Sequence, residues 1–421
     1  ESFRFHAENN HFSNWLKART EFWLAHELRP KSISDFDSVE ETRSHLIGEL
    51  RKYRHLRQRG TVTDFDIELF DPETSISRIG EGSLGGKARG ISFINKLINN
   101  YNLQNYFKNV QIKVPPAVIL STEIFDEFIS LNNLRDFALN TDDDKEILDT
   151  FINAEHFPKQ ALADLTAYIE RVTYPLAVRS SGLLEDSHVH PFAGVYETFM
   201  VPNSHADAEI RLEHLLNTVK AVYASTYFSS AKEYTAATDY RLEDEKMGVV
   251  IQKVCGSRRD HRFYPVISGT AQSYNFYAIH PLTPEDGIAS VALGLGEIVV
   301  EGGASLRFSP RHPNHILQLS TPQLALENNQ HDFYAIHLDE NHITPGKHII
   351  HSYPLSEAEK DSTLNYVAST YSQQDDMIRD SISQPGIRLI TLAPILKYDL
   401  FPFVDIIKSL LELGKWGMGT P

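Results

Sequence analysis

The stretch "YPLAVRSSGLLEDSHVHPFAGVYETF" (174–199) combines a core strand with a polar site. Its apolar run at 176–178 is typical of a buried strand, and it leads directly into Arg179, Ser180, a second serine and a glycine. A guanidinium presents its donors in a rigid fork that matches phosphate oxygens. We therefore predict an anion-binding arginine at the end of a core strand. The alternative is a structural ion pair with the acidic residues at 185–186.

A glycine-rich loop precedes this strand in "RIGEGSLGGKARGISFINKLI" (78–98) and ends at Gly85, Gly86 and Lys87, where a helix with an apolar face is predicted. Glycines let backbone N–H groups converge on an anion, and a helix N-terminus and a lysine add positive charge. The Walker A spacing is absent because Ala88 follows the lysine, and no strong strand precedes the loop as a dinucleotide fingerprint requires. Alone, the loop is either a phosphate loop or an ordinary connection.

A third segment, "VALGLGEIVVEGGASLRFSP" (291–310), has an apolar strand that meets a Gly-Leu-Gly turn and then Glu297. A carboxylate at a glycine-flanked strand end suits Mg²⁺ that is also bridged to a nucleotide phosphate. The alternative is a tight hairpin with an exposed glutamate. Together, the three segments supply backbone donors, two cations and a metal ligand, which are the parts of a metal–nucleotide site.

The composition indicates a folded, acidic chain of more than one domain. With 421 residues it exceeds one ordinary hydrophobic core. Its net charge of −16 disfavours general binding to nucleic acid or to an anionic membrane. No apolar run approaches the ~20 residues of a membrane helix, and no secretory signal is seen. The single cysteine, Cys255, excludes an internal disulfide and a cysteine-based metal site and favours a reducing cytoplasm.

The chain divides into three predicted parts. Residues 1–72 are predicted to be a helical N-terminal segment, whose basic run "RKYRHLRQR" (51–59) is either a patch for an anion or partner or a solvated helix face. From about residue 73, strand and helix patterns alternate, which predicts a mixed α/β (α+β) fold. We predict a first lobe at 73–245 and a second lobe at 246–421.

Five motifs occur in the order and spacing of a known domain: "GGKARG", "VPPAVILSTEIFDEF", "AVRSSGLLEDSHVHPFAGVYETF", "MGVVIQKV" and "GLGEIVVEGG". They resemble the nucleotide-binding domain of phosphoenolpyruvate synthase and pyruvate phosphate dikinase over roughly residues 76–310. In that family the domain resembles an ATP-grasp fold, with ATP between two lobes. A phosphoryl group passes from ATP to a histidine on a swivelling domain, and then to pyruvate on a C-terminal barrel.

The resemblance implies roles for residues in the first two segments. The nucleotide phosphates would contact Gly85, Gly86, Lys87, Arg179 and Ser180. Lys87 and Arg179 would also be the catalytic residues. Arg307, beyond the third segment, would be a further phosphate ligand.

The resemblance also implies residues for the metal and the base. Glu297 would bind Mg²⁺, Gln252 would lie near the adenine, and Thr198 would lie on a flexible loop that covers the nucleotide. The implied activity is that of a cytoplasmic phosphotransferase that depends on ATP and Mg²⁺. No segment resembles the phosphohistidine swivelling domain or the pyruvate/phosphoenolpyruvate barrel, so we expect both partners to lie outside this chain.

The sequence departs from the family in two places. The segment "FYPVISGTAQSYNFY" (263–277) lacks the arginine and aspartate of the family's "FTRDP"-like stretch, and "SHVHP" (187–191) carries two loop histidines. These histidines are either metal ligands or phosphorylation sites, or ordinary surface residues. A second functional hypothesis is therefore a degenerate regulatory module that senses ATP or AMP without transfer. A third is a stand-alone phosphotransferase acting on a small molecule or a glucan.

Overall fold

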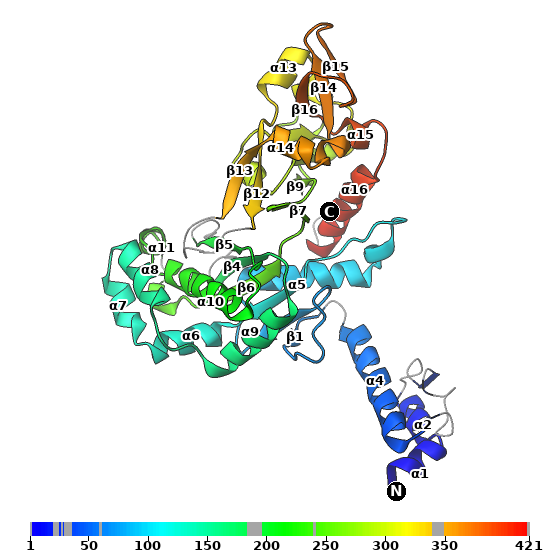
Figure 1. Cartoon of the computed structure of the whole chain (residues 1–421), viewed down its shortest axis with the longest axis vertical. Helices are drawn as coiled ribbons and strands as arrows, with labels where there is room; N and C mark the ends of the chain where they lie inside the picture. Colours follow the sequence, from blue (N-terminus) through cyan, green and yellow to red (C-terminus); the bar gives the residue numbers. More distant parts are fainter. Residues whose placement is uncertain are drawn as a thin grey trace.

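The computed structural model has two lobes and a set of N-terminal helices. It describes residues 2–19, 25–26, 28, 36–58, 61–182, 196–238, 241–338 and 349–418. Figure 1 shows the N-terminal helices at one end, the first lobe in the middle and the second lobe at the other end. The N-terminal helices are α1 (Ser2–Glu8), α2 (His11–Ala18) and α4 (Val39–Gln58). No helix in the described part of the chain is long and apolar enough to cross a bilayer.

The first lobe is built on a six-stranded sheet in the order β1-β2-β3-β6-β4-β5. Its strands are β1 (Thr63–Asp64), β2 (Ile76–Ile79), β3 (Ala117–Leu120), β4 (Leu176–Gly182), β5 (Thr198–Val201) and β6 (Met247–Lys253). β1, β2 and β3 are parallel, whereas β6 runs antiparallel to both β3 and β4. The apolar run at 176–178 thus forms a core strand, as predicted, with a neighbour on each side.

Helices cover the two faces of this sheet. They are α5 (Gly85–Asn100), α6 (Thr122–Leu131), α7 (Leu134–Asn140), α8 (Asp144–Ile152), α9 (Lys159–Arg171), α10 (Ala208–Ser225) and α11 (Ser229–Ala236). Side chains alternate between faces along a strand, so Leu176 and Val178 pack in the main core with residues of α6, α9 and α10. Ala177 and Arg179 point to the opposite face, where α5 packs on the sheet (Figure 1).

The second lobe contains three small antiparallel sheets, ordered β11-β10-β9, β13-β12-β8-β7 and β15-β14-β16. Their strands are β7 (Ser257–Arg259), β8 (Arg262–Tyr264), β9 (Ser268–Gln272), β10 (Ile288–Ala292), β11 (Leu306–Phe308), β12 (Asp332–His337), β13 (Ile350–Pro354), β14 (Ala368–Ser372), β15 (Met377–Arg379) and β16 (Ile387–Ile390). The helices are α12 (Glu297–Val300), α13 (Pro322–Glu327), α14 (Leu355–Lys360), α15 (Ala393–Leu396) and α16 (Phe403–Met418). One apolar core joins these sheets to α14, α15 and α16.

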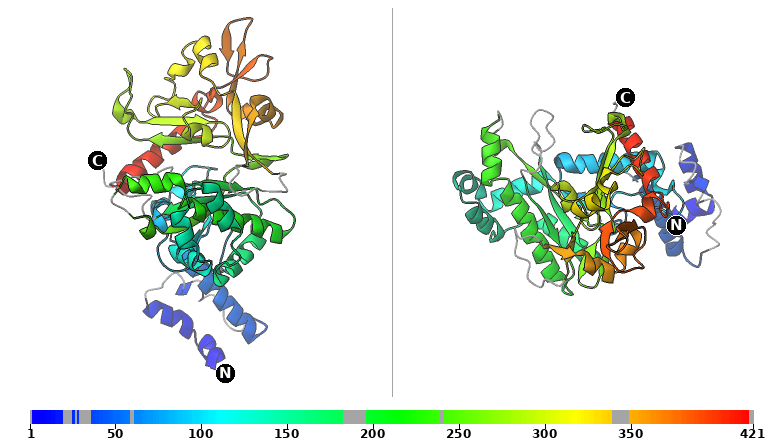
Figure 2. Two further views of the ribbon diagram at one scale, coloured as in Figure 1. Left: turned by 90° about the vertical axis from the view of Figure 1, so that its left-hand side faces the viewer. Right: turned by 90° about the horizontal axis from the view of Figure 1, so that it is seen from above.

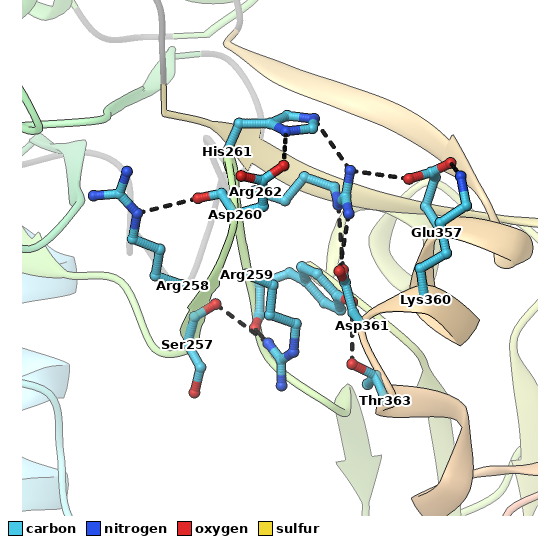
Figure 3. Close-up of polar contacts among 11 residues, drawn as sticks. Ser257, Arg258, Arg259, Asp260, His261, Arg262, Glu357, Lys360, Asp361 and Thr363 are labelled. Carbon is cyan, nitrogen blue, oxygen red and sulfur yellow. Dashed lines mark hydrogen bonds and ion pairs between the residues drawn. The ribbon is translucent and has the colours of Figure 1, made fainter.

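A buried ion pair fastens β8 to the end of α14 (Figure 3). Arg262 is only 4% exposed, and its guanidinium donates to Asp361 at 2.9 and 3.2 Å and lies 3.1 Å from Glu357. The Tyr264 hydroxyl donates to the same aspartate at 2.7 Å. A buried charge is tolerated only where partners compensate its lost hydration. Arg262 is therefore held within the lobe by these carboxylates.

Among the described residues, two apolar clusters join the lobes. A small apolar cluster near the connecting segment includes Ala177 of the first sheet and Phe263 of the second lobe. At the second contact, Leu413 of α16 packs on Ile98 and Ile112 of the first lobe. Figure 2 shows α16 running from the second lobe back toward the first. The C-terminal helix therefore joins the lobes at a distance from their covalent connection.

The lobe boundary differs from the predicted one. A boundary at 245/246 would separate β6 from its neighbours, but β6 lies between β3 and β4 in the six-stranded sheet. The connection to the second lobe thus follows Lys253, because the apolar run of β6 is buried as a central strand. Likewise β1 lies within the segment 1–72 that was predicted to be helical, and it pairs with β2. The side chains of the basic run 51–59 lie outside the described residues.

Candidate functional site

Strand β4 presents Arg179 at the face of the first sheet that carries α5. Arg179 is in register with Val250 on one side and Thr198 on the other. Its guanidinium donates to the Gln252 side-chain oxygen at 3.4 Å, and the Gln252 amide donates in turn to the Pro115 carbonyl at 3.3 Å. Gln252 is 9% exposed, so a buried amide orients the arginine. The alternative partners at 185–186 lie outside the described residues.

The glycine-rich loop brings Lys87 to the same strand. Lys87 is the third residue of α5, and its ammonium donates to the Ser180 hydroxyl at 3.0 Å across 93 residues of sequence. Ser180 is fully buried. The first two predicted segments, the glycine-rich loop and the arginine strand, therefore meet in space.

The loop can reach β4 only because it contains glycine. Gly85 begins α5 with φ +75°, a left-handed conformation that other residues rarely adopt. A Cβ on Gly85 would lie 1.6 Å from the Ser181 carbonyl oxygen. The backbone N–H groups at the start of α5 therefore lie against the end of β4, beside Lys87. Gly86 is the next residue and is also buried.

Ser181 was not among the predicted site residues, although the sequence places it two residues after Arg179. Its hydroxyl donates to the Leu84 carbonyl at 2.8 Å and accepts from the Ala88 amide at 3.1 Å. The only sequence signal was the pair of small hydroxyl residues after Arg179. A neighbouring buried carboxylate, Glu245, is 3% exposed and was missed as well.

Glu297 and Arg307 belong to the second lobe. Glu297 is the first residue of α12 and is partly buried. β10 and β11 pair antiparallel, but the helical turn lies between them, so the segment is not the alternative tight hairpin with an exposed glutamate. Gly294 before it has φ +87°, and a Cβ there would meet the Tyr334 carbonyl oxygen at 2.7 Å. Arg307 lies on β11 with an exposed side chain. Because Lys87 and Arg179 belong to the first lobe, a ligand that touched all four side chains would bridge the lobes.

Thr198 differs from its predicted setting. We expected it on a flexible loop, but it is the first residue of β5 and is paired in register with Arg179. The loop histidines at 187–191 lie outside the described residues. Within the ranges that are described, no group of three or more histidine, cysteine or acidic side chains is arranged to hold a metal ion.

The chain is similar to phosphotransferases of one family. The model of the pyruvate phosphate dikinase AMP/ATP-binding domain matches residues 81–330. An uncharacterized phosphotransferase, YvkC of Bacillus subtilis, is 28% identical over 199 residues, covering 46% of this chain and 21% of that protein. The phosphoenolpyruvate synthase of Aeropyrum pernix is 26% identical over 241 residues, covering 52% of this chain and 25% of that protein.

A third relative extends this pattern. The probable phosphoenolpyruvate synthase of Staphylothermus marinus is 26% identical over 214 residues, covering 45% of this chain and 23% of that protein. The chain thus matches no more than a quarter of the length of these relatives. The family model, by contrast, covers more than half of the 421 residues and includes the glycine-rich loop, Arg179 and Glu297. This chain therefore belongs to the family of the pyruvate phosphate dikinase AMP/ATP-binding domain.

Proposed function

We propose that this chain binds ATP between its lobes and starts a phosphoryl transfer whose acceptor is a histidine on another domain. The observation that carries the proposal is the 3.0 Å contact between the Lys87 ammonium and Ser180. This contact puts the cation of the glycine-rich loop next to the strand residue that follows Arg179. Two cations and the N–H groups of a helix N-terminus can bind phosphates and stabilise the charge of a transferring phosphoryl group.

Individual roles follow from this arrangement. Lys87 and Arg179 bind phosphate oxygens and are the catalytic residues, and the N–H groups of Gly85 and Gly86 add donors. Ser180 orients Lys87 through its hydroxyl. An arginine whose position is restrained before the ligand arrives loses less side-chain entropy on binding.

Three further residues complete the proposed site. Gln252 orients Arg179 and borders the adenine, Thr198 flanks the arginine on β5, and Arg307 supplies a phosphate contact from the second lobe. The hydrogen bond of Gln252 and the register of Thr198 support their roles. Arg307 is proposed from its exposed position on β11. Closure of the second lobe over the nucleotide would bring Arg307 to the phosphates.

Glu297 is the proposed Mg²⁺ ligand. Mg²⁺ takes oxygen ligands and is commonly held by one or two carboxylates together with substrate phosphates and water. A partly buried carboxylate at the start of α12, directly after Gly296, fits that donor set. When bound, the ion would neutralise phosphate charge and so ease attack by a nucleophile.

The acceptor and the final substrate are proposed to lie on other domains. The phosphoenolpyruvate synthases that match this chain are about four times longer than the matched segment, since that segment covers 23–25% of them. A phosphohistidine swivelling domain and a pyruvate/phosphoenolpyruvate barrel, in the same protein or in a separate chain, are the proposed partners. The proposed setting is the cytoplasm.

Calorimetric titration with ATP, with and without Mg²⁺, tests nucleotide binding. Lys87→Ala and Arg179→Met each remove a charged donor, which typically contributes about 1.5–3 kcal/mol, so each variant should weaken binding roughly 10–150-fold. Arg135→Met, which changes a surface arginine on α7, is the matched control and should leave the affinity unchanged. Full ATP affinity in Arg179→Met would contradict the proposal.

A nucleotide sensor that transfers nothing is the second candidate. It is favoured by the second lobe, where 263–277 lacks the family's arginine and aspartate and the neighbouring Arg262 is engaged by Asp361. ATP labelled separately at its β- and γ-phosphates, incubated with the histidine domain of a relative, separates the two candidates. Label on the histidine indicates a phosphotransferase, whereas binding without label indicates a sensor.

A further inference from the structure

The Ser181 hydroxyl spans the first turn of α5. It donates to the Leu84 carbonyl at 2.8 Å and accepts from the Ala88 amide at 3.1 Å. These two backbone groups are four residues apart and mark the beginning and the end of that turn. Leu84 cannot cap the helix with its own apolar side chain, and its N-cap position makes no side-chain hydrogen bond. The first N–H of the helix, that of Gly85, donates to the Ser83 hydroxyl at 3.2 Å. The Ser181 hydroxyl instead bridges the Leu84 carbonyl and the Ala88 N–H, the pair that forms the first i→i−4 bond of a regular helix.

The loop and the strand are in backbone-to-backbone contact at Ser181. A Cβ on Gly85 would lie 1.6 Å from the Ser181 carbonyl oxygen. A Cβ on Gly248 would lie 2.8 Å from the Leu84 carbonyl oxygen and 3.1 Å from that of Ser181. No side chain fits between the three segments, so the loop lies directly on β4. The two hydrogen bonds of Ser181 align it there, together with the Lys87–Ser180 contact and the hydrogen bond from the Ser83 N–H to the Thr122 hydroxyl.

This alignment bears directly on the two cations. Lys87 lies within the turn that Ser181 spans, and Arg179 lies two residues before Ser181, on the same face of β4. Like charges repel, so two nearby cations keep a fixed spacing only if the backbone holds them. Donors whose positions are fixed in advance need no reorganisation when a charged ligand arrives.

We infer that Ser181 is a positioning residue that holds Lys87 in register with Arg179 for the phosphates. This inference rests on the proposed function and adds to it a residue that helps to set the geometry of the phosphate site. Ser181 acts through Lys87 and does not itself contact the nucleotide. Its removal should therefore matter only while the lysine is present.

A double-mutant cycle in the whole chain tests the inference. ATP affinity is measured by displacement of fluorescent trinitrophenyl-ATP for the native chain, Ser181→Ala, Lys87→Ala and the double variant. Each hydrogen bond that is lost costs about 1 kcal/mol of interaction free energy. Ser181→Ala removes two such bonds, so it should weaken ATP binding about fivefold to thirtyfold. In the Lys87→Ala background the same change should cost less than twofold.

Two further variants separate positioning from a general loss of stability. Ser77→Ala removes a buried hydroxyl from β2 of the same sheet, far along the strand order from β4, and should leave ATP affinity unchanged. Ser181→Cys keeps a side chain of similar size with a weak donor and acceptor. It should recover part of the lost affinity, and it replaces the alanine variant in the cycle if that variant does not fold.

The outcomes distinguish this inference from the function on which it rests. If the native chain does not bind ATP, the proposed function fails and the inference fails with it. If the native chain binds ATP but the effects of Ser181→Ala and Lys87→Ala simply add, the function stands. Ser181 is then only structural, and the inference is overturned. A fivefold or larger loss that disappears without Lys87 supports it.

Discussion

Replacing Gly85 by alanine should damage both the first lobe and its proposed phosphate site. The added Cβ would lie 1.6 Å from the Ser181 carbonyl oxygen. Since ordinary contacts begin near 3.4 Å, loop and strand must separate by about 2 Å. The φ of +75° adds strain, since left-handed backbone costs a non-glycine residue about 1–2 kcal/mol. With overpacking of about 1–3 kcal/mol, the free energy of unfolding of the lobe should fall by roughly 2–5 kcal/mol.

Gly90 offers a matched control in the same helix. It lies in the interior of α5, and a Cβ there would meet nothing within 4 Å. Gly90→Ala should therefore raise helix stability by about 0.5–1 kcal/mol. Urea unfolding followed by circular dichroism, with ATP titration of each folded variant, compares the two glycines. ATP binding should weaken at least tenfold in Gly85→Ala, because Lys87 moves with the loop, and should be unchanged in Gly90→Ala.

The result that refutes this reasoning is specific. If Gly85→Ala unfolds at the same urea concentration as the native chain and binds ATP equally well, the loop does not pack on β4 as described. If both glycine variants are destabilised alike, the effect belongs to the helix and not to the contact with Ser181.

Two other predictions concern the second lobe. Arg262→Met should lower the free energy of unfolding by about 3–5 kcal/mol, because it leaves the Asp361 carboxylate buried without its cation. Urea unfolding measures this loss, and it should show little change for the control Arg258→Met, which replaces an exposed arginine on the same hairpin. Equal effects of the two substitutions would contradict the buried ion pair. The Thr283 backbone N–H, which donates to Asp286 at 2.7 Å, holds the pKa of that carboxyl below its usual value. A carboxyl whose pKa is lower in the folded state than in the unfolded state stabilises the fold at pH values above its unfolded pKa of about 3.9. The stability that Asp286 contributes should therefore be lost as the pH falls below about 4. Urea unfolding of Asp286→Asn and of the native chain across pH 3–7 checks this prediction, because the variant's loss of unfolding free energy should shrink at low pH. A loss that does not depend on pH would refute it.

Much of the local structure could be predicted from the sequence. The apolar run at 176–178, the helix that begins at the glycine-rich loop and the strand before Glu297 all have patterns of the correct period. The order and spacing of the motifs also identified the family, which the match over residues 81–330 confirms. Residue type alone indicated that Lys87 and Arg179 suit phosphate.

Contacts between distant segments could not be read in this way. The apolar pattern of β6 predicts a buried strand but does not indicate which strands lie beside it. The predicted lobe boundary therefore separated β6 from β3 and β4. The family resemblance placed Thr198 on a loop, and a strand of only four residues has too little periodic signal to indicate otherwise. The two hydrogen bonds of Ser181 could not be predicted because both partners lie more than ninety residues earlier in the chain.

The sequence by itself determined which residue types stand at the ends of the strands and helices, because backbone periodicity and glycine spacing are local properties. It thereby indicated a phosphate site of the dikinase family. Only the tertiary structure decided that Lys87 meets Ser180, that Gln252 orients Arg179 and that Ser181 bridges the first turn of α5. Those contacts depend on sheet order and register, which arise from the packing of the whole lobe rather than from any single segment.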